Sequence, residues 1–423
     1  MFAIDAQVSP MAVGGTETHV PLQIDALARH SDERFLVIGL ADQSEELRPL
    51  IGSNMELMAY PGHYAWYRPG AFDRWNPSPG WRRLMAAAGP WRGLVREAVR
   101  RRFEPDSLSA AQNDALLRPH GVKAIHFPYP QYFETKLPMI YEPWGLPHRN
   151  LPQTFQPGEP SWIDNMMRHG CEKAAMVIVA TRWVKRDLIA AYGLAPEKIA
   201  VLPRNPVFQR PPELDQPDAK IGELPEVFAL CPGAAWPHKN HVGLLRGMAR
   251  LRDQHGLKLQ LVCTGRTQTT AFPAIKQAIA ELGLKSQVRF LGRVSRRQLD
   301  DLFRRATFLA HPSKFEGLGL PLVEAMQMDL PIVAAAASSI PEVVADAAIL
   351  FDPDNPDDIA EALKRALQTP AWRDELRQRG RRRLAEYFPS HEGLAARFVA
   401  VYRRAAGLAL DAADAALLAE MTA

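Results

Sequence analysis

The segment from Phe308 to Met326, FLAHPSKFEGLGLPLVEAM, constrains the fold of this chain more than any other stretch. It begins with the apolar end of a buried strand, continues as a loop broken by proline and glycine, and ends in apolar residues spaced for one face of a helix. The N–H groups at a helix start are unpaired and carry partial positive charge. A strand, a glycine loop and a helix in this order therefore form a natural site for a phosphate.

Two glutamates, Glu316 and Glu324, bracket this loop. A carboxylate repels an anion that it touches, so the consistent arrangement places phosphates on the backbone N–H groups and neutral hydroxyl groups on the glutamates. A nucleotide sugar supplies such hydroxyls, from its sugar at one end and its ribose at the other. The alternative is that both are ordinary solvated residues, but the glycines, prolines and apolar helix around them favour the binding site.

Length and composition predict a globular protein of two domains. At 423 residues the chain exceeds one ordinary core, and two domains of about 200 residues are the natural expectation. An apolar fraction of 47% with 23% charged residues excludes a disordered chain and a membrane bundle. The mild net charge of +4, without interleaved aromatic and basic residues, predicts no nucleic-acid partner.

The cysteines and the N-terminus predict a cytoplasmic location. Cys171, Cys231 and Cys263 are widely separated, show no metal-ligand spacing and lie in or beside apolar runs, so we expect buried free thiols in a reducing compartment. The first ten residues have no basic leader, and no run of eighteen apolar residues occurs.

Several motifs resemble those of a known enzyme family in order and spacing. They are GGTETHV at Gly14–Val20, WPHKNHVGLLRGMARL at Trp236–Leu251, LGRVSRRQLDDLFRRA at Leu291–Ala306, the E-x7-E glutamate pair and SSIPEV at Ser338–Val343. Together they resemble the retaining nucleotide-sugar glycosyltransferases of family four, in the mannosyltransferase-like group. The resemblance covers essentially the whole chain and is closer after residue 225. It implies an α/β protein of the GT-B fold, in which two Rossmann-like domains with parallel sheets face each other across a cleft.

This fold implies four parts of the chain. We expect an acceptor-side domain over residues 1–205, a linker over 206–225, a donor-nucleotide domain over 226–388, and a C-terminal helix and tail over 389–423 that cross back toward the first domain. The linker shows five prolines, alternating charge and no periodicity.

The resemblance also assigns residues to the donor. Glu316 would hold the donor sugar, Glu324 the ribose and Lys239 the diphosphate, which makes Glu316 and Lys239 candidate catalytic residues. The adjacent residues Gly14 and Gly15 let a backbone approach a bulky ligand. In the family, the loop that carries these glycines faces the phosphates. The further predicted donor-binding residues are Gly14, Gly15, Arg266, Gly292, Arg293, Val294, Gly317, Leu318, Gly319 and Leu320.

The sequence departs from the family pattern at two places. Relatives have an arginine five residues before the lysine, where this chain has Ala234; Arg266, at a comparable strand end, is the candidate replacement, and Arg204 is a weaker one. Relatives also show a His-Asp pair where this chain has Trp144 and Gly145. Either His148 takes over that catalytic contact or the sugar pocket is reshaped.

The predicted reaction is transfer of a hexose, with GDP-mannose as the first candidate donor, to a saccharide or lipid-linked saccharide with retention. No cofactor is expected. An Asp-x-Asp at the start of DPDNPDD, Asp352–Asp358, lies between a strand and a helix, so helix capping explains it better than a metal site. Two alternatives remain open: a nucleotide-sugar epimerase of the same fold, and a nucleotide-sugar-binding protein that has lost catalysis.

Two further stretches suggest contacts with an acceptor. Aromatic residues interleaved with prolines between 60 and 82 could stack on sugars or pin the loop to its own domain. The basic amphipathic segment Trp91–Phe103 could lie on an anionic membrane or be a solvated helix. The predicted partners are thus a nucleotide sugar, a saccharide or lipid-linked acceptor, and an anionic membrane at whose inner face the protein would lie.

Overall fold

The computed structural model describes residues 1–7, 16–40, 44–61, 108–155, 158–204 and 223–423. Gly14 and Gly15, the aromatic residues from 64 to 81, the basic segment Trp91–Phe103 and most of the linker lie outside the described residues.

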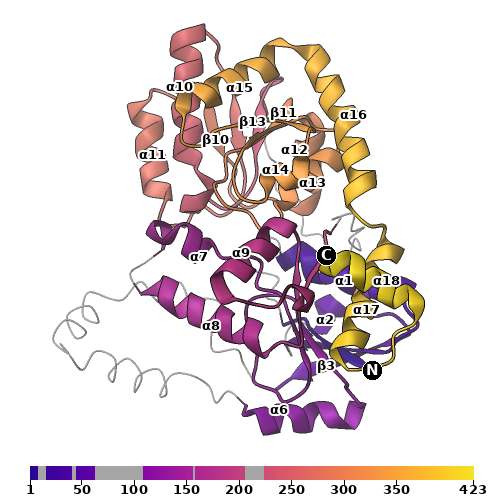
Figure 1. Cartoon of the computed structure of the whole chain (residues 1–423). Coiled ribbons are helices and arrows are strands. Elements are labelled where there is room, and N and C mark those ends of the chain that lie inside the picture. The colour runs from indigo at the N-terminus through magenta and orange to yellow at the C-terminus, as the bar shows by residue number, and fades with distance from the viewer. Residues whose placement is uncertain (8–15, 41–43, 62–107, 156–157, 205–222) are drawn as a thin grey trace, which may run out of the picture.

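The chain forms two parallel β-sheets, one above the other in Figure 1. The first has seven strands in the order β3-β2-β1-β4-β5-β6-β7, and the second has six in the order β10-β9-β8-β11-β12-β13. The strands of the first sheet are β1 (Phe2–Asp5), β2 (Phe35–Leu40), β3 (Met55–Tyr60), β4 (Ile125–Phe127), β5 (Met139–Tyr141), β6 (Met176–Val179) and β7 (Ile199–Val201). Those of the second are β8 (Ala229–Cys231), β9 (Leu261–Cys263), β10 (Val288–Phe290), β11 (Phe308–His311), β12 (Ile332–Ala335) and β13 (Ala348–Phe351).

Helices connect the strands and cover the sheets. In the first half they are α1 (Thr16–His30), α2 (Ser44–Leu47), α6 (Ala110–Leu117), α7 (Pro147–Asn150), α8 (Glu159–Lys173) and α9 (Arg182–Tyr192). In the second half they are α10 (His241–His255), α11 (Phe272–Glu281), α12 (Arg296–Arg305), α13 (Leu320–Gln327), α14 (Ile340–Val344), α15 (Pro356–Gln368), α16 (Pro370–Tyr387), α17 (His391–Ala405) and α18 (Ala412–Thr422). No helix of the described segments is long and apolar enough to cross a membrane.

Strands β2, β6 and β12 are apolar throughout because both of their faces are buried, whereas the edge strands β3 and β10 carry Glu56 and Arg289. In β2, Phe35 and Val37 belong to one hydrophobic cluster, whereas Leu36 and Ile38 belong to the cluster on the opposite face. Continuous apolar strands of this kind are typical of parallel sheets packed between helices. The predicted α/β class with two parallel sheets is confirmed.

Each sheet reverses its strand order next to its first strand. In the second sheet β8 lies between β9 and β11, so the chain leaves this centre in both directions. Ligands of open α/β sheets bind beyond the carboxyl ends of the strands at such a point. The chain that follows β8 leads to Lys239, and the chain that follows β11 leads to Glu316.

The two domains touch at the glutamate loop. The Thr181 hydroxyl, at the end of β6, donates a hydrogen bond to the carbonyl oxygen of Gly317 over 3.0 Å. The Trp183 ring packs edge-on against Phe315 with centroids 5.6 Å apart. The loop after β11 therefore meets the first domain directly.

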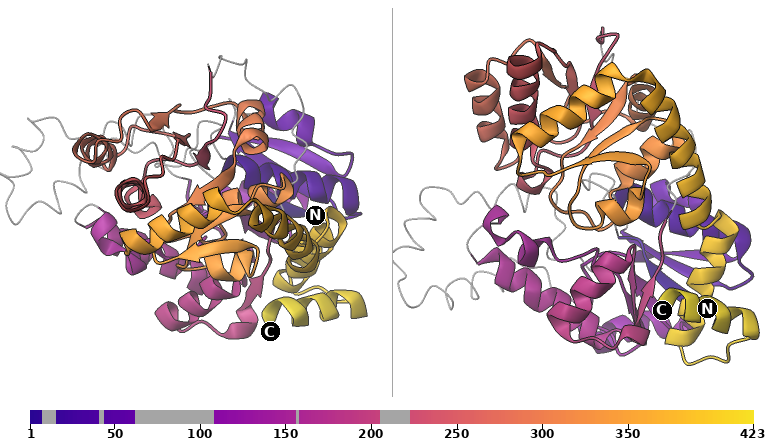
Figure 2. Two further views of the ribbon diagram at one scale, coloured as in Figure 1. Left: turned by 90° about the horizontal axis from the view of Figure 1, so that it is seen from above. Right: turned by 45° about the horizontal axis from the view of Figure 1, so that its top comes forward.

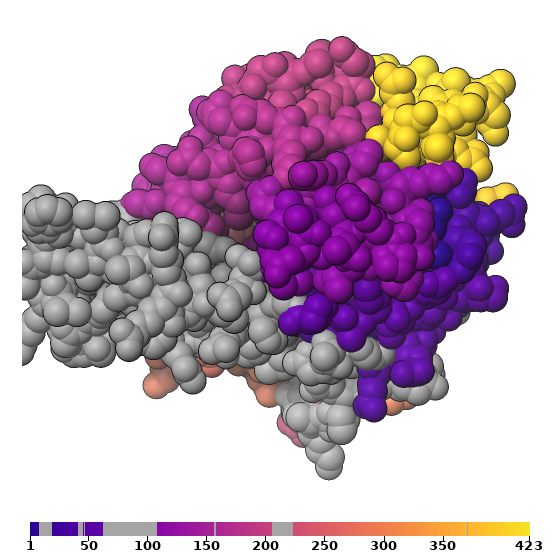
Figure 3. Space-filling view, turned by 90° about the horizontal axis from the view of Figure 1, so that it is seen from below, coloured from indigo at the N-terminus to yellow at the C-terminus, as the bar shows by residue number. Residues whose placement is uncertain are grey.

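The C-terminal helices return to the first domain. Figure 2 shows α16 running down from the second domain to α17 and α18, which lie beside the first domain, and Figure 3 shows their surface against it. Tyr402 of α17 packs against Phe2 and Phe35, with ring centroids 5.3 and 6.1 Å apart. The core of the first domain is thus completed by the end of the chain.

Candidate active site

Glu316 stands at the centre of the site, in the loop between β11 and α13. The Lys239 ammonium donates a hydrogen bond to Glu316 Oε1 over 2.6 Å, and His311 Nε2 lies 3.0 Å from the same oxygen. Lys239 ends the short 3-10 turn Pro237–Lys239 that follows β8. The neighbouring strands β8 and β11 thus deliver a cation and an imidazole to one carboxylate.

This arrangement keeps Glu316 ionised. Burial alone would raise the pKa of Glu316, but the charge of Lys239 and the hydrogen bond with His311 hold the pKa well below its ordinary value. The carboxylate is therefore an acceptor of hydrogen bonds at neutral pH and not a general acid.

Two serines fix the backbone of Glu316. The Glu316 N–H donates to Ser338 Oγ over 2.8 Å, and Ser339 Oγ donates to the Glu316 carbonyl over 2.7 Å. Both serines belong to the SSIPEV motif after β12. This motif therefore acts by holding the glutamate loop.

The glycines of the loop are needed for different reasons. A Cβ atom at Gly317 would lie 2.1 Å from the Trp144 carbonyl oxygen in the first domain, so only glycine allows this approach. Gly319 has a φ of +77° and immediately precedes α13. Leu318, Gly319 and Leu320 have backbone N–H groups without a hydrogen-bond partner among the described residues. These are the groups that the sequence predicts to bind phosphate.

Glu324 lies on α13 and is paired with Arg296, a residue that the sequence did not single out. The carboxylate is 5% exposed and forms an ion pair with Arg296 at the start of α12. Arg296 also pairs with Asp300 Oδ1 over 2.6 Å. Burial raises the pKa of Glu324, and the charge of Arg296 opposes this effect.

The exits of β8, β9 and β10 form one continuous edge beside Lys239. Ala235 N–H donates to the Arg266 carbonyl over 2.9 Å, and Gly265 N–H donates to the Gly292 carbonyl over 2.7 Å. Gly292 has a φ of +72°, and Arg293 and Val294 follow it, with Arg293 exposed. Arg266 is therefore carried by the loop that adjoins Ala234.

Two family models match the chain. A model of glycosyl transferases group 1 matches residues 217–383, and one of glycosyltransferase family 4 matches residues 13–204. Together they span both domains. The chain belongs to the group 1/family 4 glycosyltransferases.

Curated relatives and solved structures agree with this family. The chain is 34% identical over 222 residues to MMP alpha-(1->4)-mannosyltransferase of Mycolicibacterium hassiacum, 52% of this chain and 51% of that protein. It is 25% identical over 228 residues to O-antigen chain mannosyltransferase B of Escherichia coli, 52% of this chain and 58% of that protein. The matched stretch is thus only about half the length of these curated relatives.

Likeness to solved structures extends over the whole fold. Sucrose-phosphate synthase from Thermosynechococcus elongatus has a TM-score of 0.65 at 17% identity, covering 96% of this chain and 99% of that one. WaaG, a glycosyltransferase involved in lipopolysaccharide biosynthesis, has a TM-score of 0.59 at 17% identity, covering 96% and 98%. These likenesses confirm the predicted GT-B fold.

The structure does not bring His148 to the Glu316 group. His148 lies on α7, is 1% exposed, and has its Nε2 3.2 Å from Asp164 Oδ1 of α8. Burial lowers its pKa, and its ring packs edge-on against Phe155. The position nearest the glutamate loop is instead held by Trp144, which has a φ of +62° and touches Gly317 through its carbonyl.

Arg204 serves a buried cluster of the first domain. Its Nη2 lies 2.6 Å from Glu142 Oε2, and His19 and His126 lie 3.0 and 2.8 Å from the same carboxylate. Burial and the charge of Arg204 lower the pKa of His19 to about 4. Burial alone would raise the pKa of Glu142. The charges of Arg204 and His19 outweigh this effect and hold that pKa well below its usual range. The charge of Arg204 is thus taken up inside the first domain, whereas Arg266 lies in the loop that adjoins Ala234.

The acidic run after β13 contains the cap of helix α15. Asn355 Oδ1 accepts hydrogen bonds from the N–H groups of Asp357 and Asp358, over 3.0 and 3.3 Å, at the start of α15. The segment DPDNPDD thus contains the cap of α15, as expected, but the capping residue is Asn355 and neither aspartate of the Asp-x-Asp.

Proposed function

We propose that the protein transfers a hexose from a nucleotide-diphosphate sugar to a saccharide or lipid-linked saccharide, with retention at the anomeric carbon. The observation that carries this proposal is the Lys239–Glu316 pair, 2.6 Å long, beside the unpaired N–H groups of Leu318 to Leu320. A cation and an ionised acceptor side by side suit a ligand with a diphosphate and sugar hydroxyls.

In this mechanism the protein stabilises the charge that develops on the diphosphate as the anomeric C–O bond breaks. Lys239 would exchange part of its contact with Glu316 for a phosphate oxygen, and the N–H groups before α13 would bind the others. One cation at about 4 Å in an effective dielectric near 20 contributes roughly 4 kcal/mol, which corresponds to about three powers of ten in rate. The acceptor would attack from the face that the diphosphate leaves, and the diphosphate would take its proton.

The glutamates orient the donor in this proposal. Glu316, ionised and held through its backbone by Ser338 and Ser339, would accept hydrogen bonds from sugar hydroxyls. Glu324 would accept from the ribose, sharing its carboxylate with Arg296. Arg266 would supply the charge that Ala234 lacks, so that no metal ion is needed at the diphosphate. Transfer unaffected by added Mg²⁺ or Mn²⁺ is the corresponding expectation.

Mannose is the first candidate sugar, because the two relatives named above are described as mannosyltransferases. A melting-temperature screen against UDP-, GDP- and dTDP-sugars tests the donor, since a ligand at a hundred times its Kd adds about 2.7 kcal/mol to stability. We expect a rise with GDP-mannose alone. A rise in melting temperature with a UDP- or dTDP-sugar would instead identify that nucleotide sugar as the donor. No rise with any nucleotide sugar would contradict the proposal.

The transfer reaction is tested with the responding donor and a panel of mannosides and lipid-linked glycans. We expect Glu316→Ala to lower kcat strongly and Glu324→Ala to raise the KM for the donor about tenfold with a smaller change in kcat. Asp300→Ala, at the other partner of Arg296, is the matched control. Donor turnover without any acceptor would support the epimerase, and binding without turnover would support a protein that has lost catalysis.

We further propose a cytoplasmic location with contact to the inner face of the membrane. The proposal rests on the basic amphipathic pattern of Trp91–Phe103 and on the lipid-linked acceptor. Sedimentation with vesicles containing about a third phosphatidylglycerol, but not with neutral vesicles, is the expected result; equal recovery in the supernatant with both would exclude the contact.

A further inference from the structure

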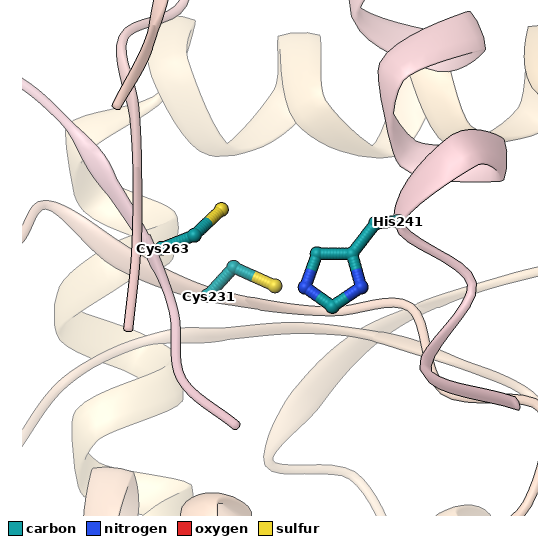
Figure 4. A group of neighbouring side chains, drawn as sticks. All are labelled: Cys231, His241 and Cys263. Carbon is teal, nitrogen blue, oxygen red and sulfur yellow. The ribbon is translucent and has the colours of Figure 1, made fainter. Parts of the chain in front are cut away.

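Three side chains able to bind a metal lie together in the second domain, where the loops that lead to Lys239 and Arg266 begin. Cys231 and Cys263 end the neighbouring strands β8 and β9 and lie directly opposite each other in the sheet. His241 is the first residue of α10. The two sulfurs and a ring nitrogen lie within 4.8 Å of one another, and all three residues are buried (Figure 4).

His241 is the unexplained member of this group. It is 4% exposed, and neither ring nitrogen has a hydrogen-bond partner among the residues that the structure describes. In Figure 4 the sulfur of Cys231 points toward its ring. Buried imidazoles without partners are rare, because desolvation of the ring nitrogens is costly when nothing replaces water. An apolar residue would suit an ordinary core position better, so the imidazole calls for another role.

The donor set suits a soft or borderline cation. Thiolate and imidazole ligands are those of zinc, with Zn–S near 2.3 Å and Zn–N near 2.0 Å, whereas calcium and magnesium prefer oxygen. Tetrahedral bonds of these lengths place two sulfurs roughly 3.8 Å apart. The two sulfurs lie within 4.8 Å of each other, which is at most about 1 Å more than this tetrahedral separation. Small side-chain rotations would close the difference.

We propose that Cys231, His241 and Cys263 bind one zinc ion. The ion would fasten β8, β9 and the start of α10 together at the point where the loops to Lys239 and Arg266 begin. It would leave the fourth position for a water or another small ligand and would not touch the donor. This inference is independent of the proposed transfer reaction.

Zinc content and thiolate ligation provide the direct test. We expect the full-length protein, stripped of metal and kept reduced, to take up one equivalent of Zn²⁺ with a rise of about 5 to 10 °C in the melting temperature at a hundredfold excess over Kd. With Co²⁺ as the probe, a thiolate-to-metal charge-transfer band should appear. The proposal would be overturned if the protein took up no Zn²⁺, or if the Co²⁺ form lacked this band. It would also be overturned if Cys231 and Cys263 formed a disulfide that reducing agent does not break.

Variants distinguish the site from other metal binding. Cys231→Ser and Cys263→Ser should each weaken zinc affinity by roughly a hundredfold or more, whereas Cys171→Ser, a buried thiol of the first domain, should leave it unchanged. His241→Leu should raise the melting temperature of the metal-free protein and abolish the zinc-dependent rise. Equal losses in the Cys171 variant, or a full zinc response in the His241 variant, would refute the assignment.

Discussion

At the scale of single residues, the charge state of Glu316 is set by its partners and not by its position in the loop. Lys239 and His311 share one carboxylate oxygen and lower the pKa of Glu316 against the effect of burial. Glu324 shows the opposite balance, because burial raises its pKa in spite of Arg296. The two glutamates of one motif therefore have different electrostatic surroundings.

The Glu316 pair should make stability depend on pH. Because folding lowers its pKa, the carboxylate stabilises the protein fully above the ordinary value of 4.5 and loses this contribution as the pH falls below it. Glu316→Gln should cost about 2 kcal/mol at pH 7, and its difference from the original protein should shrink between about pH 5 and pH 3. Urea unfolding across this range measures it, with the exposed Glu386→Gln as control. A difference that stays constant with pH would contradict the ion pair.

Lys239 should act mainly on the chemical step. Lys239→Met should lower kcat/KM about a thousandfold, because it removes a cation from the leaving diphosphate. Lys239→Arg should retain part of the rate, since it keeps the charge. Steady-state kinetics measure both, and the exposed Lys285→Met is the control; a loss no greater than in that control would remove Lys239 from the mechanism.

At the scale of elements, the two domains approach closely at Gly317, where a Cβ atom would meet the Trp144 carbonyl oxygen. Gly317→Ala should push Trp144 and the glutamate loop apart, because the new methyl group meets a backbone oxygen at 2.1 Å. We expect a lower melting temperature and a loss of at least tenfold in kcat/KM. Gly393→Ala, in the first turn of α17 beside the flexible Arg397 side chain, should be tolerated. Similar behaviour of the two variants would show that the close contact is unimportant.

Local patterns predicted the elements well. The prolines and glycines of the segment Phe308–Met326 correctly marked the loop and the start of α13. At the start of α9, the Thr181 hydroxyl accepts a hydrogen bond from Val184 N–H over 3.3 Å, which is a local cap of the same kind. These signals are local because caps and turns are made by neighbours in the sequence.

Contacts between residues that are far apart in the chain could not be predicted from the sequence. Glu142 meets His19, His126 and Arg204 only through the order of the strands in the first sheet. The cysteines show the same limit: Cys231 and Cys263 were interpreted as too far apart for a metal site, whereas parallel pairing of β8 and β9 places them opposite each other. Their burial as free thiols was predicted correctly.

At the scale of the molecule, one glutamate joins the two domains. The Glu342 carboxylate, from the SSIPEV motif, accepts hydrogen bonds from the N–H groups of Arg182 and Trp183, both over 2.7 Å, at the start of α9. Tyr387 of α16 donates its hydroxyl to the same carboxylate over 2.6 Å. A negative charge at a helix N-terminus is favourable, so this contact stabilises the observed arrangement of the domains.

Glu342→Ala should therefore loosen the domains without unfolding either one. It leaves two N–H groups of α9 without their acceptor, at a cost of about 1–3 kcal/mol. We expect a larger radius of gyration in small-angle X-ray scattering and a raised KM for the donor. Glu386→Ala on α16 is the control, and an unchanged scattering profile would argue against the role of Glu342.

The return of α17 to the first domain has a consequence for biosynthesis. Phe2 and Phe35 leave the ribosome well before Tyr402, against which both pack, because Tyr402 is made some 370 residues later than Phe35. During most of translation the nascent first domain must therefore expose the apolar surface that this helix will cover. We therefore expect the nascent first domain to be prone to aggregation until α17 has been made.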